Sequence, residues 1–419
     1  MGRLGPLGTW GFEMQSATAG MEFSSVFNSP SIDTTIKHGG AASGKISGSI
    51  AAGTVQGFAH VMTMATRVFG RAYVYIDSLD ASDDGVVFFE IMDTTGATSA
   101  LAVQFINLAG TLRMEAYANA FGDSIDVSSA APVFDQWMRV EFEYNAANAG
   151  ATDVVTIKLA VADPEGTADT VGTRSDLTLA TTPGFFQVGV FNSSGIAITG
   201  STVYFDDICF NTSTGSVNNS FPGSGIGVIA LPTAAGDNAA TAGLFSYINE
   251  IPPSDTATAG GTDIIELDTT TAIGDYNVTD TATLGISSSD TINMVAVVGR
   301  IREEIAGTSN YTLRIKSASG GTTIASSSVD AGNATPRTNP SGTTAFAISL
   351  VSETDPTTGV AWTSTGTNSI ESMQIGAATT DGFPDTWCLW LGVMIEYIDV
   401  AAPPSTAAIG YRNLLGVGI

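Results

Sequence analysis

The sequence predicts an all-β protein built from two antiparallel β-sandwich domains, both jelly-roll-like, in tandem. Three observations lead to this prediction. Apolar residues alternate with polar ones at period two in almost every apolar run, which is typical of strands with one buried face and one solvated face. Turn-forming residues separate these runs, and no segment keeps a helical period over three turns. At 419 residues, the chain is longer than one domain usually is.

The first half of the chain shows the alternation most clearly at residues 138–144. Met138, Val140, Phe142 and Tyr144 fall on one face there, and charged residues fall on the other. Less regular runs of the same kind lie at residues 71–76, 86–92, 101–106, 112–117, 155–161 and 185–191. Gly-, Asn- and Asp-containing turn signals lie between them, at residues 82–85, 107–110, 145–150 and 183–184. Many short strands separated by turns predict an antiparallel sandwich or barrel.

A change of composition follows Phe210. Residues 213–225 are polar, glycine-rich and uncharged, which predicts a linker or a domain-joining loop. We therefore expect one domain over residues 1–212 and a second β-sandwich, serving assembly, over residues 226–419. The strand candidates of the second domain are residues 294–301, 311–316, 346–351, 373–376 and 387–400. Residues 230–290 show a weak pattern and predict long loops with a short strand or two.

The charge balance excludes several classes of partner. The chain has 15 Lys+Arg against 41 Asp+Glu, a net charge of −26, so nucleic acid and anionic membrane surfaces would repel it. Its 43% hydrophobic content is too high for a disordered acidic chain. No apolar run is long enough for membrane insertion. The first ten residues lack the features of a signal peptide, so we expect synthesis in the host cytoplasm.

The two cysteines, Cys209 and Cys388, each lie in an apolar run. We interpret them as small buried hydrophobic residues, with a disulfide as the alternative. No pair of cysteines has metal-binding spacing, and His38 and His60 are the two histidines of the chain, so we expect no zinc site.

Four segments of the first half resemble concanavalin A-like (laminin-G-like) jelly rolls: residues 11–14, 21–25, 136–144 with its Trp-x-Arg-Val-Glu strand, and 203–210. Residues 290–302, 354–363 and 369–376 are similar to a module that accompanies this jelly roll in tailed-bacteriophage structural proteins. The resemblance implies a virion component exposed on capsid or tail, with other virion proteins as partners.

Glycan hydrolysis needs two carboxylates on one face, about 5–9.5 Å apart. Glu90 and Asp93 are three positions apart, so a strand directs them to opposite faces. Glu141 and Glu143 share a face, but Arg139 lies on it too, and Lys158 is expected to pair across the strands. We interpret that face as an ordinary solvated one, and we predict that the protein is not an enzyme.

A structural Ca²⁺ ion is the candidate cofactor. In sandwiches of this type, a carboxylate near the first strand meets acids on the last strand, here Glu13 with Asp206 and Asp207. Hard cations prefer several oxygen ligands. Alternation places Asp206 on the same face as Tyr204, Ile208 and Phe210, where an unpaired carboxylate is costly. The alternative is that Asp206 accepts hydrogen bonds from a loop or an Arg while Asp207 is solvated.

Tryptophans are the candidates for sugar binding or for an interface, with packing in the core as the commoner alternative. Trp137 starts a strand on its polar face, and Trp362 follows the turn at residues 355–359 as the candidate loop-edge aromatic. The tail at residues 401–419 ends in an apolar stretch, for which we expect docking on a neighbouring subunit, hence a homo-oligomer.

These observations support a non-enzymatic structural protein on the exterior of a phage virion, as capsid decoration or tail component, that contacts host-surface glycans. The alternatives are a glycan-binding host-recognition adhesin and, third, a glycan-active hydrolase.

Overall fold

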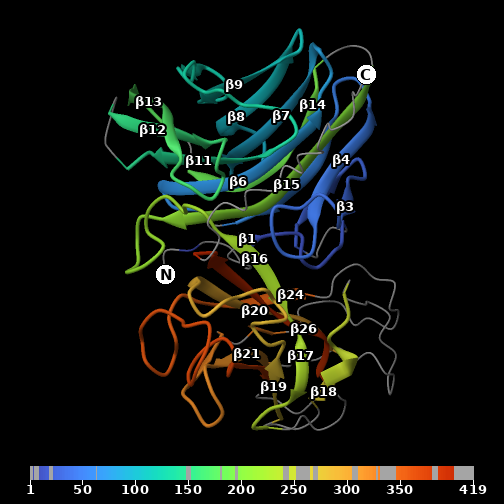
Figure 1. The fold of residues 1–419 in the computed structure, drawn as a ribbon, viewed down its shortest axis with the longest axis vertical. Coiled ribbons are helices and arrows are strands. Elements are labelled where there is room, and N and C mark those ends of the chain that lie inside the picture. The colour runs from blue at the N-terminus through green and yellow to red at the C-terminus, as the bar shows by residue number, and fades with distance from the viewer. Residues whose placement is uncertain are drawn as a thin grey trace, which may run out of the picture.

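The computed structural model describes residues 3, 9–17, 22–62, 64–147, 152–179, 182–193, 197–238, 245–251, 265–267, 272–303, 310–326, 329–330, 346–379 and 386–400. Figure 1 shows two β-sandwiches stacked along the long axis of the molecule, the first in blue to green and the second in yellow to red. Their strands form four antiparallel sheets, which confirms the predicted fold class. The described residues include no helix able to cross a membrane.

The first sandwich consists of sheets A and B. Sheet A has the order β13 (Asp169–Leu177), β12 (Asp153–Ala160), β11 (Trp137–Asn145), β6 (Arg67–Ser78), β15 (Ile198–Thr212), β4 (Ser43–Ile50) and β3 (Ser31–Asp33), with β1 (Thr9–Trp10) paired to β15. Sheet B has the order β10 (Asp123–Ile125), β9 (Thr111–Ala118), β8 (Ser99–Leu108), β7 (Ser82–Asp93), β14 (Pro183–Asn192), β5 (Val55–Val61) and β2 (Ser25–Phe27). The alternating runs of the sequence are these strands.

The core of the first sandwich lies between the two sheets. The apolar face predicted for residues 138–144 points into it, and Met138, Val140, Phe142 and Tyr144 are all buried there. Phe89 of β7 and Phe210 of β15 meet Phe142 at ring-centroid distances of 5.2 and 6.2 Å. We call the opposite side of each sheet, which faces away from this core, its outer face.

The second sandwich consists of sheets C and D. Sheet C has the order β16 (Ile226–Ala230), β26 (Thr386–Ile398), β20 (Thr291–Glu303) and β24 (Phe346–Ser352), with β18 (Ile265–Leu267) paired to β26. Sheet D has the order β17 (Pro232–Ala235), β19 (Ile273–Val278), β25 (Gln374–Thr379), β21 (Asn310–Lys316) and β22 (Thr323–Ala325), with β23 (Val329–Asp330) paired to β21. A 3₁₀ turn, η1, spans Phe245–Tyr247.

Strand β26 carries apolar residues on both of its faces, because both faces of sheet C are covered. Val393 and Ile395 point into the core of the second sandwich. Met394 packs in a separate cluster on the other face, and Trp390 belongs to the hydrophobic cluster of the first sandwich. The two sandwiches therefore pack directly on each other, as a strand buried on both sides requires.

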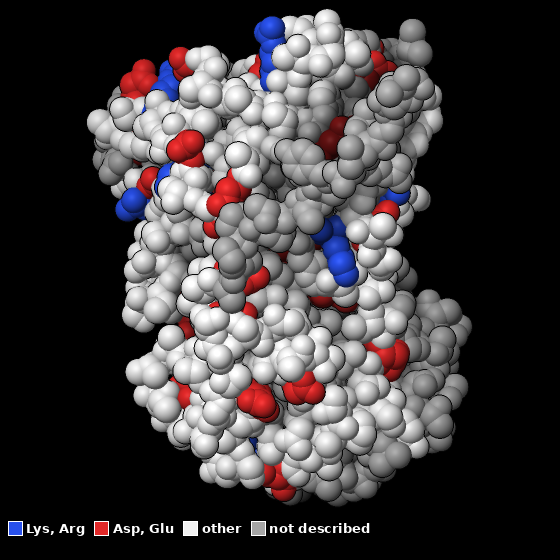
Figure 2. All heavy atoms as spheres, in the orientation of Figure 1, with Lys and Arg blue, Asp and Glu red and all other residues white. Residues whose placement is uncertain are grey.

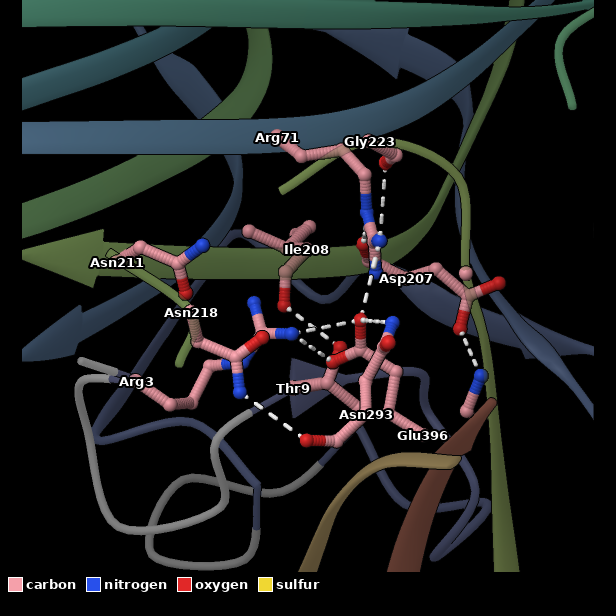
Figure 3. Close-up of polar contacts among 12 residues, drawn as sticks. Arg3, Thr9, Arg71, Asp207, Ile208, Asn211, Asn218, Gly223, Asn293 and Glu396 are labelled. Carbon is pink, nitrogen blue, oxygen red and sulfur yellow. Dashed lines mark hydrogen bonds and ion pairs between the residues drawn. The ribbon is translucent and has the colours of Figure 1, made fainter. Parts of the chain in front are cut away.

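A buried ion cluster lies at this junction, and Figure 3 shows its members converging from both sandwiches. Glu396 of β26 contacts Arg3 at 2.7 Å and Arg71 of β6 at 3.2 Å, and none of the three side chains is exposed in these pairs. Asn293 of β20 also donates to the Glu396 carboxylate. Burial alone would raise the pKa of Glu396, but the charges of Arg3 and Arg71 lower it below its usual value.

The segment predicted as a linker, residues 213–225, packs on the outer face of sheet A. The Gly223 N–H donates to Glu141 at 2.5 Å, and the ring of Phe221 lies 3.8 Å from the ammonium of Lys158. Glu141 and Glu143 are buried, and Glu143 pairs with Arg67 at 2.7 Å. The prediction of a solvated face at Glu141 and Glu143 was therefore wrong, because the chain folds back over it.

Both cysteines are free and buried, so they are small interior residues and the disulfide alternative is excluded. The predicted docking of the tail at residues 401–419 lies outside the described residues. Figure 2 shows acidic side chains scattered over the visible face of both sandwiches.

Glu396→Ala leaves two guanidinium groups without their carboxylate in the interior. We expect the free energy of unfolding to fall by about 3–5 kcal/mol, measured by urea denaturation. Glu371→Ala removes an exposed carboxylate from the same sandwich and should change stability by less than about 0.5 kcal/mol. Equal effects of the two substitutions would show that the ion cluster does not join the sandwiches.

Candidate functional site

The three predicted carboxylates meet on one side of the first sandwich. Strand β1 pairs with β15 through Trp10 and Ile208, so the residues after β1 run alongside the centre of β15. Glu13, Asp206 and Asp207 are each at most 1% exposed. A Cβ atom placed on Gly11 would lie 3.3 Å from both Glu13 and Asp207. The pairing of β1 with β15 thus places both Glu13 and Asp207 beside Gly11.

A β-bulge in β15 decides how the two aspartates point. The register with β6 shifts between Asp206 and Cys209, and Asp207 has a positive φ of 44°. Ile208 and Phe210 point into the core, whereas Asp206 pairs with Tyr73 on the outer face of sheet A. The prediction from simple alternation, which places Asp206 on the same face as Ile208 and Phe210, was wrong. A bulge inserts an extra residue, so the side chains beyond it point to the opposite face from the one that alternation predicts.

Backbone N–H groups satisfy these carboxylates. Asp206 accepts hydrogen bonds from the N–H of His38 and of Asp207, both at 2.9 Å. Glu13 accepts from Ala41 at 2.8 Å. The loop approaches so closely that a Cβ atom on Gly40, whose φ is +54°, would lie 2.0 Å from Glu13. Glycine is therefore required at this position of the loop.

Asp207 forms hydrogen bonds to both sandwiches. Its Oδ1 accepts the N–H of Gly227, in β16, at 2.6 Å. Its carbonyl accepts from Nε of Arg71 at 3.0 Å, and Arg71 also contacts Glu396. The alternative interpretation, in which Asp207 is solvated, was wrong. The Asp207 side chain connects the cluster of carboxylates to the junction between the sandwiches.

His38 joins the acids to the aromatic surface of sheet A. Its Nδ1 lies 2.7 Å from Asp207, and its Nε2 contacts Glu165. Its ring stacks on Tyr73 with centroids 3.5 Å apart and meets Trp137 edge-on at 5.8 Å. Burial lowers the pKa of His38, but hydrogen bonds to the two carboxylates outweigh this and raise it.

For the acids that lack a basic partner, burial has the largest effect on the pKa. It raises the pKa of Glu13 and Asp206 well above their usual values, and the neighbouring carboxylates raise both further. Burial also raises the pKa of Glu22 to about 8. The Oε1 of Glu22 accepts the N–H of Glu13 at 3.1 Å, whereas its Oε2 has no hydrogen-bond partner among the described residues. The cluster therefore holds more buried acid than base.

Sequence reasoning missed Glu22, His38 and Glu165. A signal was present for one of them: His38 is one of two histidines and directly precedes Gly39 and Gly40, a loop composition that permits close backbone approach. Glu22 and Glu165 carry no such signal, because each is brought in by a separate loop.

The two candidate tryptophans differ in burial. Trp137 is partly exposed at the start of β11. Trp362 is 3% exposed, packs in the core of the second sandwich, and donates its indole N–H to the carbonyl of Ser352 at 3.2 Å. The prediction of Trp362 as an exposed loop-edge aromatic was wrong, because the loop folds its ring inward.

Trp137 belongs to a row of side chains that crosses four strands of sheet A. It pairs in register with Tyr75 of β6, Tyr75 pairs with Tyr204 of β15, and Tyr204 pairs with Lys45 of β4. Ring centroids are 5.6 Å apart for Trp137 and Tyr75 and 5.7 Å apart for Tyr75 and Tyr204. The ammonium of Lys45 lies 5.3 Å from the Tyr204 ring. We call these four residues the aromatic row.

Glu90 and Asp93 serve separate local structures. Glu90, on the outer face of sheet B, accepts a hydrogen bond from Gln187 at 2.6 Å, and burial raises its pKa. Asp93 accepts the N–H groups of Thr95 and Ala97, both at 3.0 Å, in the turn after β7.

No protein-family model matches the chain, and no curated protein matches it. Among solved structures, it is similar to the cellulose-induced protein Cip1 (20% identity, TM-score 0.32, covering 47% of this chain and 88% of that one). It is also similar to an endo-β-1,4-glucuronan lyase from the fungus Trichoderma reesei (14%, 0.32, 45% and 91%). A third likeness is to the CBM2 module of the evolved Dit of Lactobacillus casei BL23 phage J-1 (10%, 0.31, 50% and 95%). Similarity at this level carries no information on activity or ligand.

Glu22→Gln should make stability less dependent on pH. The pKa of Glu22 in the folded protein, about 8, lies above its ordinary value of 4.5. Folding therefore takes up a proton between these two pH values, and the wild type loses stability as pH rises through them. The variant keeps the hydrogen-bond acceptor without the charge, so its advantage in melting temperature should grow from pH 5 to pH 8. If the melting temperatures of wild type and variant, measured in EDTA, change in parallel with pH, the raised pKa of Glu22 is contradicted.

Proposed function

We propose that this chain is a non-enzymatic structural component on the exterior of a tailed-phage particle and that it contacts host-surface glycans through the aromatic row. The observation that carries the proposal is the in-register alignment of Trp137, Tyr75 and Tyr204, with Lys45 at its end. Trp137, Tyr75 and Lys45 are partly exposed, whereas Tyr204 is buried beside them. Such a surface offers apolar ring area together with hydroxyl and ammonium groups.

The chemistry of the row suits a sugar. Tyr and Trp rings combine apolar contact area with a polar group, which is why they are common at binding surfaces. Tyr75 lies near the carboxylates of Asp77 and Asp135, and Lys45 pairs with Asp33 at 3.0 Å. These groups surround the rings with hydrogen-bond donors and acceptors for hydroxyls, while the rings supply the apolar contact.

A structural rather than catalytic role is supported by the acids weighed for hydrolysis. Glu141 is held by the Gly223 N–H and Glu143 by Arg67, so both are engaged within the fold. The exterior position is supported by the net charge of −26, which repels packaged nucleic acid. The sequence resemblance to phage structural modules supplies the particle as context, with other virion proteins and further copies of this chain as partners.

We propose that Ca²⁺ stabilises the acid cluster. Glu13, Asp206 and Asp207 offer carboxylate oxygens, the donors that calcium prefers. Burial and the neighbouring carboxylates raise the pKa of Glu13 and Asp206, so a bound cation would favour their ionised forms. Within the described part of the chain, no three His, Cys, Asp or Glu side chains are already arranged as metal ligands. The support is therefore the type of donor and the number of buried acids, and calcium would supply positive charge among them.

Trp137→Ala should weaken glycan binding at least tenfold, which corresponds to about 1.4 kcal/mol, because it removes the partly exposed end of the row. Glycan-array binding by the full chain measures this. Val61→Ala, which trims another exposed apolar side chain on sheet B, should bind like the wild type. Unchanged binding by Trp137→Ala would remove the row from the proposal. Electron cryomicroscopy of intact particles distinguishes a virion component from an adhesin that acts elsewhere.

Removal of calcium should lower the melting temperature. Saturation at a hundred times the dissociation constant contributes about 2.7 kcal/mol, which is a shift of about 5–10 °C for a domain of this size. Glu13→Gln should abolish the difference between EDTA and calcium. An EDTA-insensitive wild type that carries no metal by mass spectrometry would exclude the ion.

A further inference from the structure

A separate cleft lies on the opposite sheet of the first sandwich. It has a volume of about 640 Å³ and is lined by β9, the end of β10 and residues 126–132. Its polar lining includes Arg113, Glu115, Tyr117, Ser124, Asp126 and Ser128. The aromatic row belongs to sheet A and β9 belongs to sheet B, so the two surfaces are distinct. In Figure 1, β9 lies at the end of the first sandwich away from the second one.

The turn beside this cleft has an unfavourable backbone conformation and carries an exposed aromatic side chain at its tip. Asn119, Ala120 and Phe121, in the loop between β9 and β10, have φ values of 52°, 55° and 66°. Three successive residues with a Cβ in the left-handed region are costly, and such conformations persist only where the surroundings impose them. Phe121, at the tip, is 48% exposed.

The surroundings impose this conformation through hydrogen bonds. The side-chain amide of Asn119 donates to Asp123 at 2.7 Å and to the carbonyl of Thr178 at 3.1 Å. The N–H of Ala120 donates to the carbonyl of Ser99 at 2.8 Å. Three hydrogen bonds therefore hold the turn in a conformation that leaves the Phe121 side chain half exposed.

Phe121 lies beside the cleft, next to its lining residue Tyr117. Their ring centroids are 5.7 Å apart, and Tyr117 is a lining residue. The hydroxyl of Tyr117 donates to Glu115 Oε2 at 2.9 Å, which orients this carboxylate beside the rings. The cleft thus combines a preorganised aromatic edge with an oriented acceptor, and preorganisation lowers the entropic cost of binding.

The charge and size of the cleft define its ligand. Glu115 and Asp126 outweigh Arg113 among the polar lining residues named above, so an anionic ligand is disfavoured. The volume is that of a small-molecule site. We propose that this cleft binds a neutral oligosaccharide of a few residues, which stacks on Tyr117 and Phe121 and donates hydroxyl hydrogen bonds to Glu115 and Asp126. This inference does not depend on the aromatic row or on a place in a virion.

The test uses the full chain and neutral tetrasaccharides of glucose, galactose and mannose, with a uronic-acid tetrasaccharide for comparison. Isothermal titration calorimetry measures affinity, and saturation-transfer NMR measures contact. We expect at least one neutral tetrasaccharide to bind, Phe121→Ala to weaken it tenfold or more, and Glu115→Gln to weaken it severalfold. Because Phe121 is exposed, its substitution should leave the melting temperature unchanged.

Two control variants separate this site from the rest of the molecule. Val360→Ala trims an exposed apolar side chain of the second sandwich and should bind like the wild type. Trp137→Ala disables the aromatic row, so tetrasaccharide binding that survives it and is lost in Phe121→Ala assigns the ligand to the cleft. Binding lost in Trp137→Ala and retained in Phe121→Ala would overturn the inference. So would the absence of binding at millimolar tetrasaccharide or a preference for the uronic acid.

Discussion

The carboxylate of Glu396 lies in the interior between two guanidinium groups from distant parts of the chain. Arg3 comes from the N-terminal segment, Arg71 from the centre of sheet A, and Glu396 from the last described strand. Docking of the two sandwiches removes all three side chains from water, and a buried charge without a partner is strongly destabilising, so the docked arrangement must bring the three residues together. This constraint restricts how the second sandwich can sit on the first, together with the apolar packing of Trp390 against the first core.

Docking divides the outer face of sheet A into two parts. Near the junction, the paired residues Glu141 and Arg71 are buried beneath residues 213–225 and the second sandwich. Farther along the same strands, Trp137 and Tyr75 remain partly exposed. The acid cluster around Asp207 lies between these parts, linked by Gly227 to one sandwich and by His38 to the aromatic surface. One sheet thus serves as interface, candidate ion site and candidate binding surface.

Much of the fold was predictable, because period-two alternation directly reflects a sheet with one face against a core. Residues 138–144 form a strand with its predicted inner face. The position of Glu13 beside Asp207, next to Gly11, also agrees with the sequence. Other features were not: the bulge at Asp207 reverses the parity of a strand whose sequence looks regular.

The sequence by itself determined the all-β class, the strands with clear alternation, the strong negative charge and the interior character of Cys209 and Cys388. These follow from local pattern and composition, which each segment carries independently of its neighbours. Only the tertiary structure decided that Trp362 is buried, that Glu141 is covered, and that His38 and Glu165 join the acid cluster. Those properties depend on which remote segment packs against each residue, and local pattern contains no record of that packing.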